Sequence, residues 1–205
     1  MRLFIAVDLD EASREAVGLA TTRFRQMADS RRHGLARGVK WVDPRNLHLT
    51  LHFIGELGDD RVPALGAAMA EPLGIDPARL SLEGWGVFPP RGPARVIWIG
   101  ITGGVDALSL AHAALARRLE RVGISPEARA FSPHLTVGRV RVPSGPAWGD
   151  LTHDNPPPIA CGCVVDHCTL YRSLLSSAGP AYEALLRIPF AGADESRSGA
   201  DGRMP

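Results

Sequence analysis

A short strand-like motif occurs twice in this chain. Residues 48–51 read His-Leu-Thr-Leu, and residues 134–137 read His-Leu-Thr-Val. Successive side chains of a strand point to opposite faces, so His48 and Thr50 share one face while the leucines share the other. His134 and Thr136 repeat this arrangement. The motif therefore predicts two half-buried strands, each presenting one imidazole and one hydroxyl side by side.

The predicted elements around the two motifs follow the same order. A strand at residues 2–8 and a helix capped by Asp10 precede the first motif, and a strand at residues 95–101 and a helix after residues 103–104 precede the second. This order indicates a diverged internal duplication. We therefore expect an α+β, bilobal fold, in which two antiparallel-rich sheets with outer helices enclose a central cleft.

The remaining elements complete one expected domain, residues 1–190. The pattern predicts an extended piece at 39–42, a helix at 59–71, a strand at 80–87, and final strands at 163–171 and 182–190 around a hairpin loop at 176–180. Prolines and glycines at residues 143–158 predict a long surface loop. The tail, residues 191–205, has no hydrophobic periodicity and is predicted to be disordered.

Composition and charge limit the classes of function. With 45% hydrophobic residues, a chain of 205 residues can bury a core. A net charge of +1 disfavours a nonspecific nucleic-acid coat, so any anion recognition should be local. The apolar run near the start is too short for a signal peptide, and no stretch approaches a membrane span. We expect a cytoplasmic protein that is a monomer, without a membrane or an obligate protein partner.

A cysteine cluster raises the alternative of a metal site. Cys161, Cys163 and Cys168 lie close to His167, but the paired C-x-x-C knuckles that are typical of zinc sites are absent from the sequence. The simpler interpretation is a buried strand whose free thiols act as small hydrophobic groups in a reducing compartment. We expect no metal and no cofactor.

Two histidines on facing strands suit the cleavage of a phosphodiester. One group must deprotonate the attacking oxygen and another must protonate the departing one, and imidazoles with pKa values near neutrality can do both. The threonine hydroxyls can donate hydrogen bonds to the non-bridging oxygens, on which charge rises in the transition state. If the duplication creates a pseudo-twofold axis, His48 and His134 would face each other across one phosphate.

Four segments then carry a family resemblance that runs from about residue 2 to residue 190. The segments 2–8, 46–56, 133–137 and 170–173 resemble those of the bacterial and archaeal RNA 2′,3′-cyclic phosphodiesterases of the 2H phosphoesterase superfamily, historically called 2′-5′ RNA ligases. The resemblance implies metal-free hydrolysis of a terminal RNA 2′,3′-cyclic phosphate to a 2′-phosphate, with reverse 2′-5′ ligation that needs no ATP. It further implies that His48 is the proton donor and His134 the proton acceptor, which geometry alone could not assign.

Four other residues carry weaker expectations. Arg139 matches a basic position of similar proteins and could contact phosphate or stack on a base, or it could be a solvated strand end. His52 is expected on the face of His48 and Thr50, at the rim rather than in catalysis. Phe4 could stack on a base from the cleft floor, although core packing is favoured. His112 is expected to pack at the edge of a helix's apolar stripe.

Rival functions remain open at this point. The single lysine, Lys40, is not part of a phosphate-binding loop, which disfavours an ATP-driven ligase or kinase. The first rival is a related enzyme that acts on 2′-5′ oligonucleotides or small cyclic nucleotide esters, because pocket contacts decide the substrate. The second is a noncatalytic module that binds RNA ends. The presence of both histidines and both threonines argues against this module.

Overall fold

A four-stranded antiparallel sheet carries the first motif. The computed structural model describes residues 1–127, 129–141, 147–176 and 179–191. The order of strands in the first sheet is β11-β10-β1-β3, where β1 is Arg2–Asp8, β3 is His48–Glu56, β10 is His167–Ser176 and β11 is Gly179–Pro189. Because β3 is an edge strand, only one of its two edges pairs with another strand of this sheet.

A five-stranded antiparallel sheet carries the second motif. Its order is β2-β7-β6-β5-β8, where β2 is Val39–Trp41, β5 is Ser81–Phe88, β6 is Val96–Gly103, β7 is His134–Val140 and β8 is Ala160–Cys161. A two-stranded ladder joins β4 (Ala78–Arg79) to β9 (Val164–Val165). The expected α+β architecture with antiparallel sheets is therefore confirmed.

Four α-helices and three short 3₁₀ turns connect these strands in the described part of the chain. The helices are α1 (Glu11–Arg31), α2 (Val62–Met69), α3 (Val105–Arg121) and α4 (Ala147–His153), and the 3₁₀ turns are η1 (Leu35–Gly38), η2 (Pro44–Asn46) and η3 (Asp59–Arg61). As expected, the side chain of Asp10 caps α1 by accepting a hydrogen bond of 2.8 Å from the backbone N–H of Ser13. No described helix is long and apolar enough to span a membrane.

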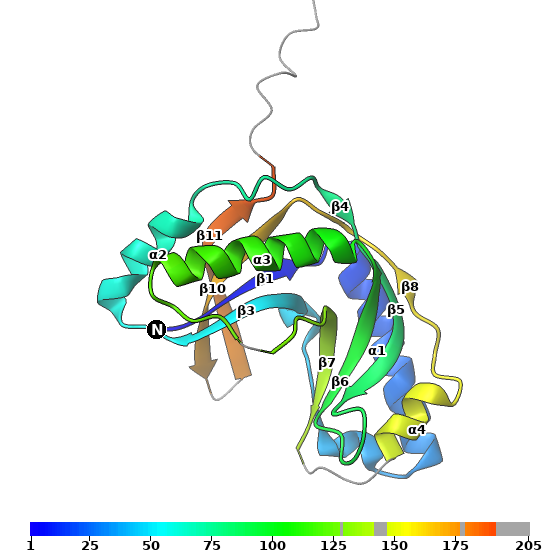
Figure 1. Ribbon diagram of the computed structural model, residues 1–205. Helices are drawn as coiled ribbons and strands as arrows, with labels where there is room; N and C mark the ends of the chain where they lie inside the picture. The colour runs from blue at the N-terminus through cyan, green and yellow to red at the C-terminus, as the bar shows by residue number, and fades with distance from the viewer. Residues whose placement is uncertain (128, 142–146, 177–178, 192–205) are drawn as a thin grey trace, which may run out of the picture.

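Each half of the sequence contributes its long helix to the sheet that carries the other half's motif. Helix α1 lies along the five-stranded sheet, where Phe24 stacks on Trp85 with ring centroids 4.3 Å apart. Helix α3 crosses the four-stranded sheet (Figure 1), and the backbone oxygen of its His112 accepts a hydrogen bond from His52 on β3. Strand β2, from the first half, pairs with β7 of the second half. The two lobes are thus mixtures of the two sequence halves.

Three predictions of local structure were wrong in detail. The proline-rich segment expected to be a loop contains α4, because Trp148 is fully buried and packs near Phe24 and Trp41. The single strand expected at residues 163–171 is divided at Asp166 into β9 and β10, because β9 pairs with β4 and β10 pairs with β1 and β11. The expected hairpin loop at 176–180 is too long, because β10 extends to Ser176 and β11 begins at Gly179. Its residues 177–178, and residues 192–205 of the expected disordered tail, lie outside the described residues.

Candidate active site

The two motif strands line a single cleft from opposite sheets. His48 and Thr50 extend from β3, whereas His134 and Thr136 extend from β7. All four residues border one cavity of about 460 Å³, and so does Arg139. The five residues that the sequence singled out are therefore brought together, with one imidazole and one hydroxyl from each sheet.

A β-bulge follows the threonine of each motif. In β3, Ala6 pairs with Thr50 and Ile5 pairs with His52, so Leu51 is an extra residue. In β7 the extra residue is Val137. Each bulge inverts the alternation of side chains beyond it. As a result, Phe53 and Arg139, which occupy the same position after their motif histidines, both return to the cleft.

The first bulge also overturns the expected position of His52. This residue was expected on the cleft face beside Thr50, but its side chain is only 3% exposed and lies on the opposite face. Its Nε2 donates a hydrogen bond of 2.8 Å to the backbone oxygen of His112, and the two imidazole rings stack 4.0 Å apart. His52 therefore connects β3 to α3 and is absent from the cleft lining.

Backbone carbonyls fix the tautomer of both motif histidines. The Nδ1 atom of His48 lies 2.8 Å from the oxygen of Asn46, and that of His134 lies 2.7 Å from the oxygen of Ser132. A carbonyl oxygen can only accept, so each Nδ1 carries a proton and donates it. Nε2 is then the nitrogen of each ring that can accept or deliver a proton. The same contact, to the residue two positions earlier, occurs in both halves.

Aromatic rings surround each histidine of the pair. Phe4 and Tyr182 lie about His48, with centroid distances of 4.9 and 5.1 Å, and Phe88 lies 4.9 Å from His134. Burial among these groups lowers the pKa of both histidines, although the carbonyl hydrogen bonds act in the opposite direction. The positive charge of Arg139 also lowers both pKa values. Phe4 is 4% exposed and forms part of the cleft floor.

Tyr182 borders the cleft, and Tyr171 and Asp8 lie beyond His48, although the sequence analysis gave none of the three a role. Tyr182 comes from β11, the far edge of the four-stranded sheet, and its neighbour Tyr171 on β10 donates a hydrogen bond to the Asp8 carboxylate at 2.8 Å. Asp8 pairs with His48 across β1 and β3, and its charge raises the pKa of that histidine. Only the pairing of strands that are distant in sequence reveals this group.

The cysteines do not form a metal centre within the described part of the chain. Cys163 and Cys168 are buried, and Cys161 is half-buried. Burial raises the pKa of all three thiols, that of Cys168 to about 12. No group of three or more His, Cys, Asp or Glu side chains among the described residues is arranged to hold a metal ion.

Comparisons of sequence identify relatives of the whole chain. A family model described as LigT like Phosphoesterase matches residues 17–98. The chain is 33% identical to the RNA 2′,3′-cyclic phosphodiesterase of Archaeoglobus fulgidus over 185 residues, which cover 90% of this chain and 98% of that protein. It is 34% identical to the protein of the same name from Thermus thermophilus over 212 residues, covering 98% and 96%.

Comparisons of structure agree with those of sequence. A crystal structure of a Thermus thermophilus protein superposes with a TM-score of 0.72 and 31% identity, covering 95% of this chain and all of that one. E. coli LigT, solved in complex with 3′-AMP, superposes with a TM-score of 0.68 and 24% identity over 93% and 98% of the two chains. The second likeness concerns the fold alone.

Proposed function

Because this chain belongs to the LigT-like phosphoesterase family, we propose that it hydrolyses the terminal 2′,3′-cyclic phosphate of RNA to a 2′-phosphate. The observation that carries the proposal is the paired arrangement of His48 and His134. Both rings come from matching strands, both have Nδ1 bound to a backbone carbonyl, and both border one cleft. An acid and a base on opposite walls of a cleft suit in-line displacement at phosphorus.

In this mechanism the two histidines act through Nε2. Neutral His134 removes a proton from water as the water oxygen attacks phosphorus. The bond from phosphorus to O3′ breaks, and protonated His48 delivers its Nε2 proton to O3′. The products are a 2′-phosphate and a 3′-hydroxyl, and one water is consumed.

The hydroxyls and the arginine of the cleft stabilise the phosphate. Thr50 and Thr136 donate hydrogen bonds to the non-bridging oxygens, where negative charge accumulates in the transition state. Arg139 supplies a positive charge that attracts the substrate and adds a charge-assisted hydrogen bond. No step uses a metal or another cofactor. A 5′-hydroxyl in place of water would give a 2′-5′ linkage by the same steps, without ATP.

The proposal also covers the domain organisation, the oligomeric state and the location of the protein. We propose that residues 1–190 act as a single bilobal domain, as a monomer in the cytoplasm. One observation supports the single domain, which is that both sheets contribute side chains to the same cleft. Light scattering of the active protein and fractionation of cells test the monomer and its location.

The decisive experiment uses an oligoribonucleotide that ends in a 2′,3′-cyclic phosphate. We expect the purified protein to convert it to a 2′-phosphate in the presence of EDTA, with the isomers resolved by chromatography. A 3′-phosphate would reverse the roles of the two histidines, and a requirement for metal would contradict the mechanism. Absence of product would overturn the proposal, and activity on small cyclic nucleotides alone would replace RNA as the substrate.

Variants of the two histidines separate catalysis from binding. We expect His48→Ala and His134→Ala each to lower kcat by about 10²- to 10⁴-fold, the usual contribution of a general acid or base, while the RNA end still binds. His33→Ala is the matched control, because His33 is exposed and lies outside the cleft. Unchanged turnover in either motif variant would contradict the assignment.

A further inference from the structure

A second cavity adjoins the candidate active site on the far side of His48. Its volume is about 470 Å³, and it shares Asn46, His48 and Tyr182 with the cleft that contains both histidines. Its other polar lining includes Asp8 and Arg14. The two hollows therefore border each other at the side chain of His48.

Most charged groups of this cavity already have partners within the protein. The Asp8 carboxylate accepts hydrogen bonds from Thr169 and Tyr171. Asp10 caps α1, and Arg45 forms a two-pronged ion pair with Asp43, with distances of 3.0 and 2.8 Å. Contacts within the protein therefore satisfy these groups. Of the two arginines that line the cavity, Arg14 is the one without such a partner.

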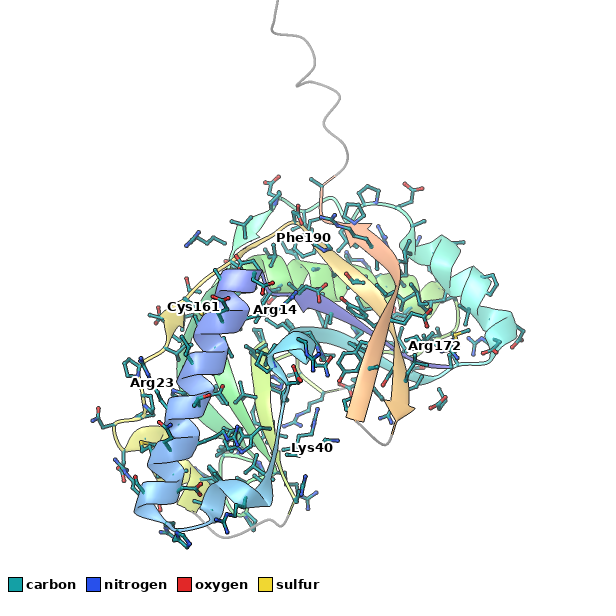
Figure 2. The ribbon with its side chains drawn as sticks, turned by 180° about the vertical axis from the view of Figure 1, so that it is seen from behind. Arg14, Arg23, Lys40, Cys161, Arg172 and Phe190 are labelled. Carbon is teal, nitrogen blue, oxygen red and sulfur yellow. The ribbon has the colours of Figure 1, made fainter. Side chains whose placement is uncertain are left out.

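Arg14 is the exception among the cavity's cations. Its Nε atom is buried without a hydrogen-bond partner, and no ion pair of Arg14 is found among the described residues. Burial and the hydrogen bond to Asp8 raise the pKa of Tyr171 to about 12, and nearby Arg14 acts in the opposite direction. Figure 2 shows Arg14 on the side of α1 toward the four-stranded sheet. Arg14 is half-buried, and its Nη1 and Nη2 atoms, unlike Nε, are not fully buried, so they are the donors that an anionic ligand in the cavity can reach.

The proposed reaction fixes the side on which the RNA chain must continue. Water attacks from the side of His134, so the departing O3′ lies toward His48. Both O2′ and O3′ belong to the terminal ribose. This ribose, and the RNA chain that leads to its 5′ oxygen, must therefore lie on the His48 side of phosphorus, where the second cavity opens.

We propose that the second cavity is a subsite for the nucleotide that precedes the cyclic phosphate, with Arg14 binding the phosphodiester that joins the two nucleotides. This inference rests on the proposed function, since it uses the assigned sides of water and O3′. A separate groove of about 590 Å³ between α1 and η2 also borders Arg14 and Arg45, but Glu11 and Glu15 line it, so the subsite is confined to the second cavity. The protein would therefore favour RNA ends over isolated cyclic nucleotides.

Three substrates test this subsite. They are a nucleoside 2′,3′-cyclic phosphate, the same compound with a 5′-phosphate, and a dinucleotide with a 2′,3′-cyclic phosphate end. We expect kcat/KM of the wild-type protein to be higher for the second and third, mainly through KM. A charge-assisted hydrogen bond contributes about tenfold or more to binding, so the Arg14→Gln variant should lower the dinucleotide-to-mononucleotide ratio of kcat/KM by about tenfold.

Matched variants distinguish a contact from a structural role. Arg23 lies on the same helix but is exposed on its other side (Figure 2), so Arg23→Gln should leave the ratio unchanged. Arg14→Lys keeps the charge and should retain part of the preference, and raising salt should weaken the wild-type preference more than that of Arg14→Gln.

The outcomes separate this inference from the proposed function. If Arg14→Gln lowered kcat/KM equally for all three substrates, or left the dinucleotide-to-mononucleotide ratio unchanged, the subsite would be overturned. A gain for the dinucleotide without a gain for the 5′-phosphorylated compound would show that the cavity binds the upstream nucleoside instead of the phosphate, which contradicts the role of Arg14. If the wild-type protein hydrolysed none of the substrates, the proposed function itself would fail.

Discussion

We expect His112→Phe to make the folded protein less sensitive to mild acid. The ring of His112 lies between His52 and Phe131, with centroid distances of 4.0 and 4.3 Å. Burial, followed by the proximity of His52, lowers the pKa of His112 from 6.5 to about 4. A phenylalanine keeps a planar ring in this stack but cannot take up a proton.

The magnitude follows from the difference in pKa between the two states. A histidine whose pKa is lowered by folding binds its proton more readily in the unfolded chain. Stability is therefore full above pH 6.5 and is lost as the pH falls toward about 4. Going from pH 7.5 to pH 5 would cost about 2 kcal/mol at 1.36 kcal/mol per pKa unit, and we halve this to about 1 kcal/mol because the ring is partly exposed.

Urea unfolding at the two pH values measures this difference. The wild-type protein should lose about 1 kcal/mol more than His112→Phe between pH 7.5 and pH 5. Exposed His33→Phe is the control and should behave like the wild type. Equal losses in the wild type and His112→Phe would refute the reasoning, because the stack would then not resist protonation.

Two further predictions concern the cleft, and a third concerns packing in the five-stranded sheet. In acid, kcat/KM should fall as His134 becomes protonated, and in base it should fall as His48 loses its proton. Because burial lowers the pKa of both histidines, we expect the optimum below pH 6.5. An optimum above pH 7 would contradict this. Thr136→Val should lower kcat by about 10²-fold with little change in folding, as measured by turnover and circular dichroism, whereas a loss confined to KM would argue against transition-state stabilisation. Gly86→Ala would press a methyl group against the ring of Trp98, so we expect a loss of about 1–3 kcal/mol in urea unfolding, and unchanged stability would show that the ring can move aside.

Local patterns in the sequence were sufficient for the elements that carry the motifs. The alternation of leucine with His48 and Thr50 predicted β3, and the same rule predicted β7. Asp10 predicted the start of α1, because a helix cap is a hydrogen bond between residues that are close in sequence. Helix α4 was missed because the burial of Trp148 depends on Phe24 and Trp41, which are distant in sequence.

The sequence by itself determined which residues could do the chemistry, and the tertiary structure decided how they are placed. Two matching strands with one imidazole and one hydroxyl each are a property of the residue order. The bulges at Leu51 and Val137 are a property of strand pairing, and they bury His52 while turning Arg139 into the cleft. Contacts between distant segments decide how the two sheets face each other. They also decide that α1 covers the sheet with the second motif and α3 the sheet with the first. An alternating pattern describes only one strand at a time, so it could not predict how strands pair or how the sheets are arranged.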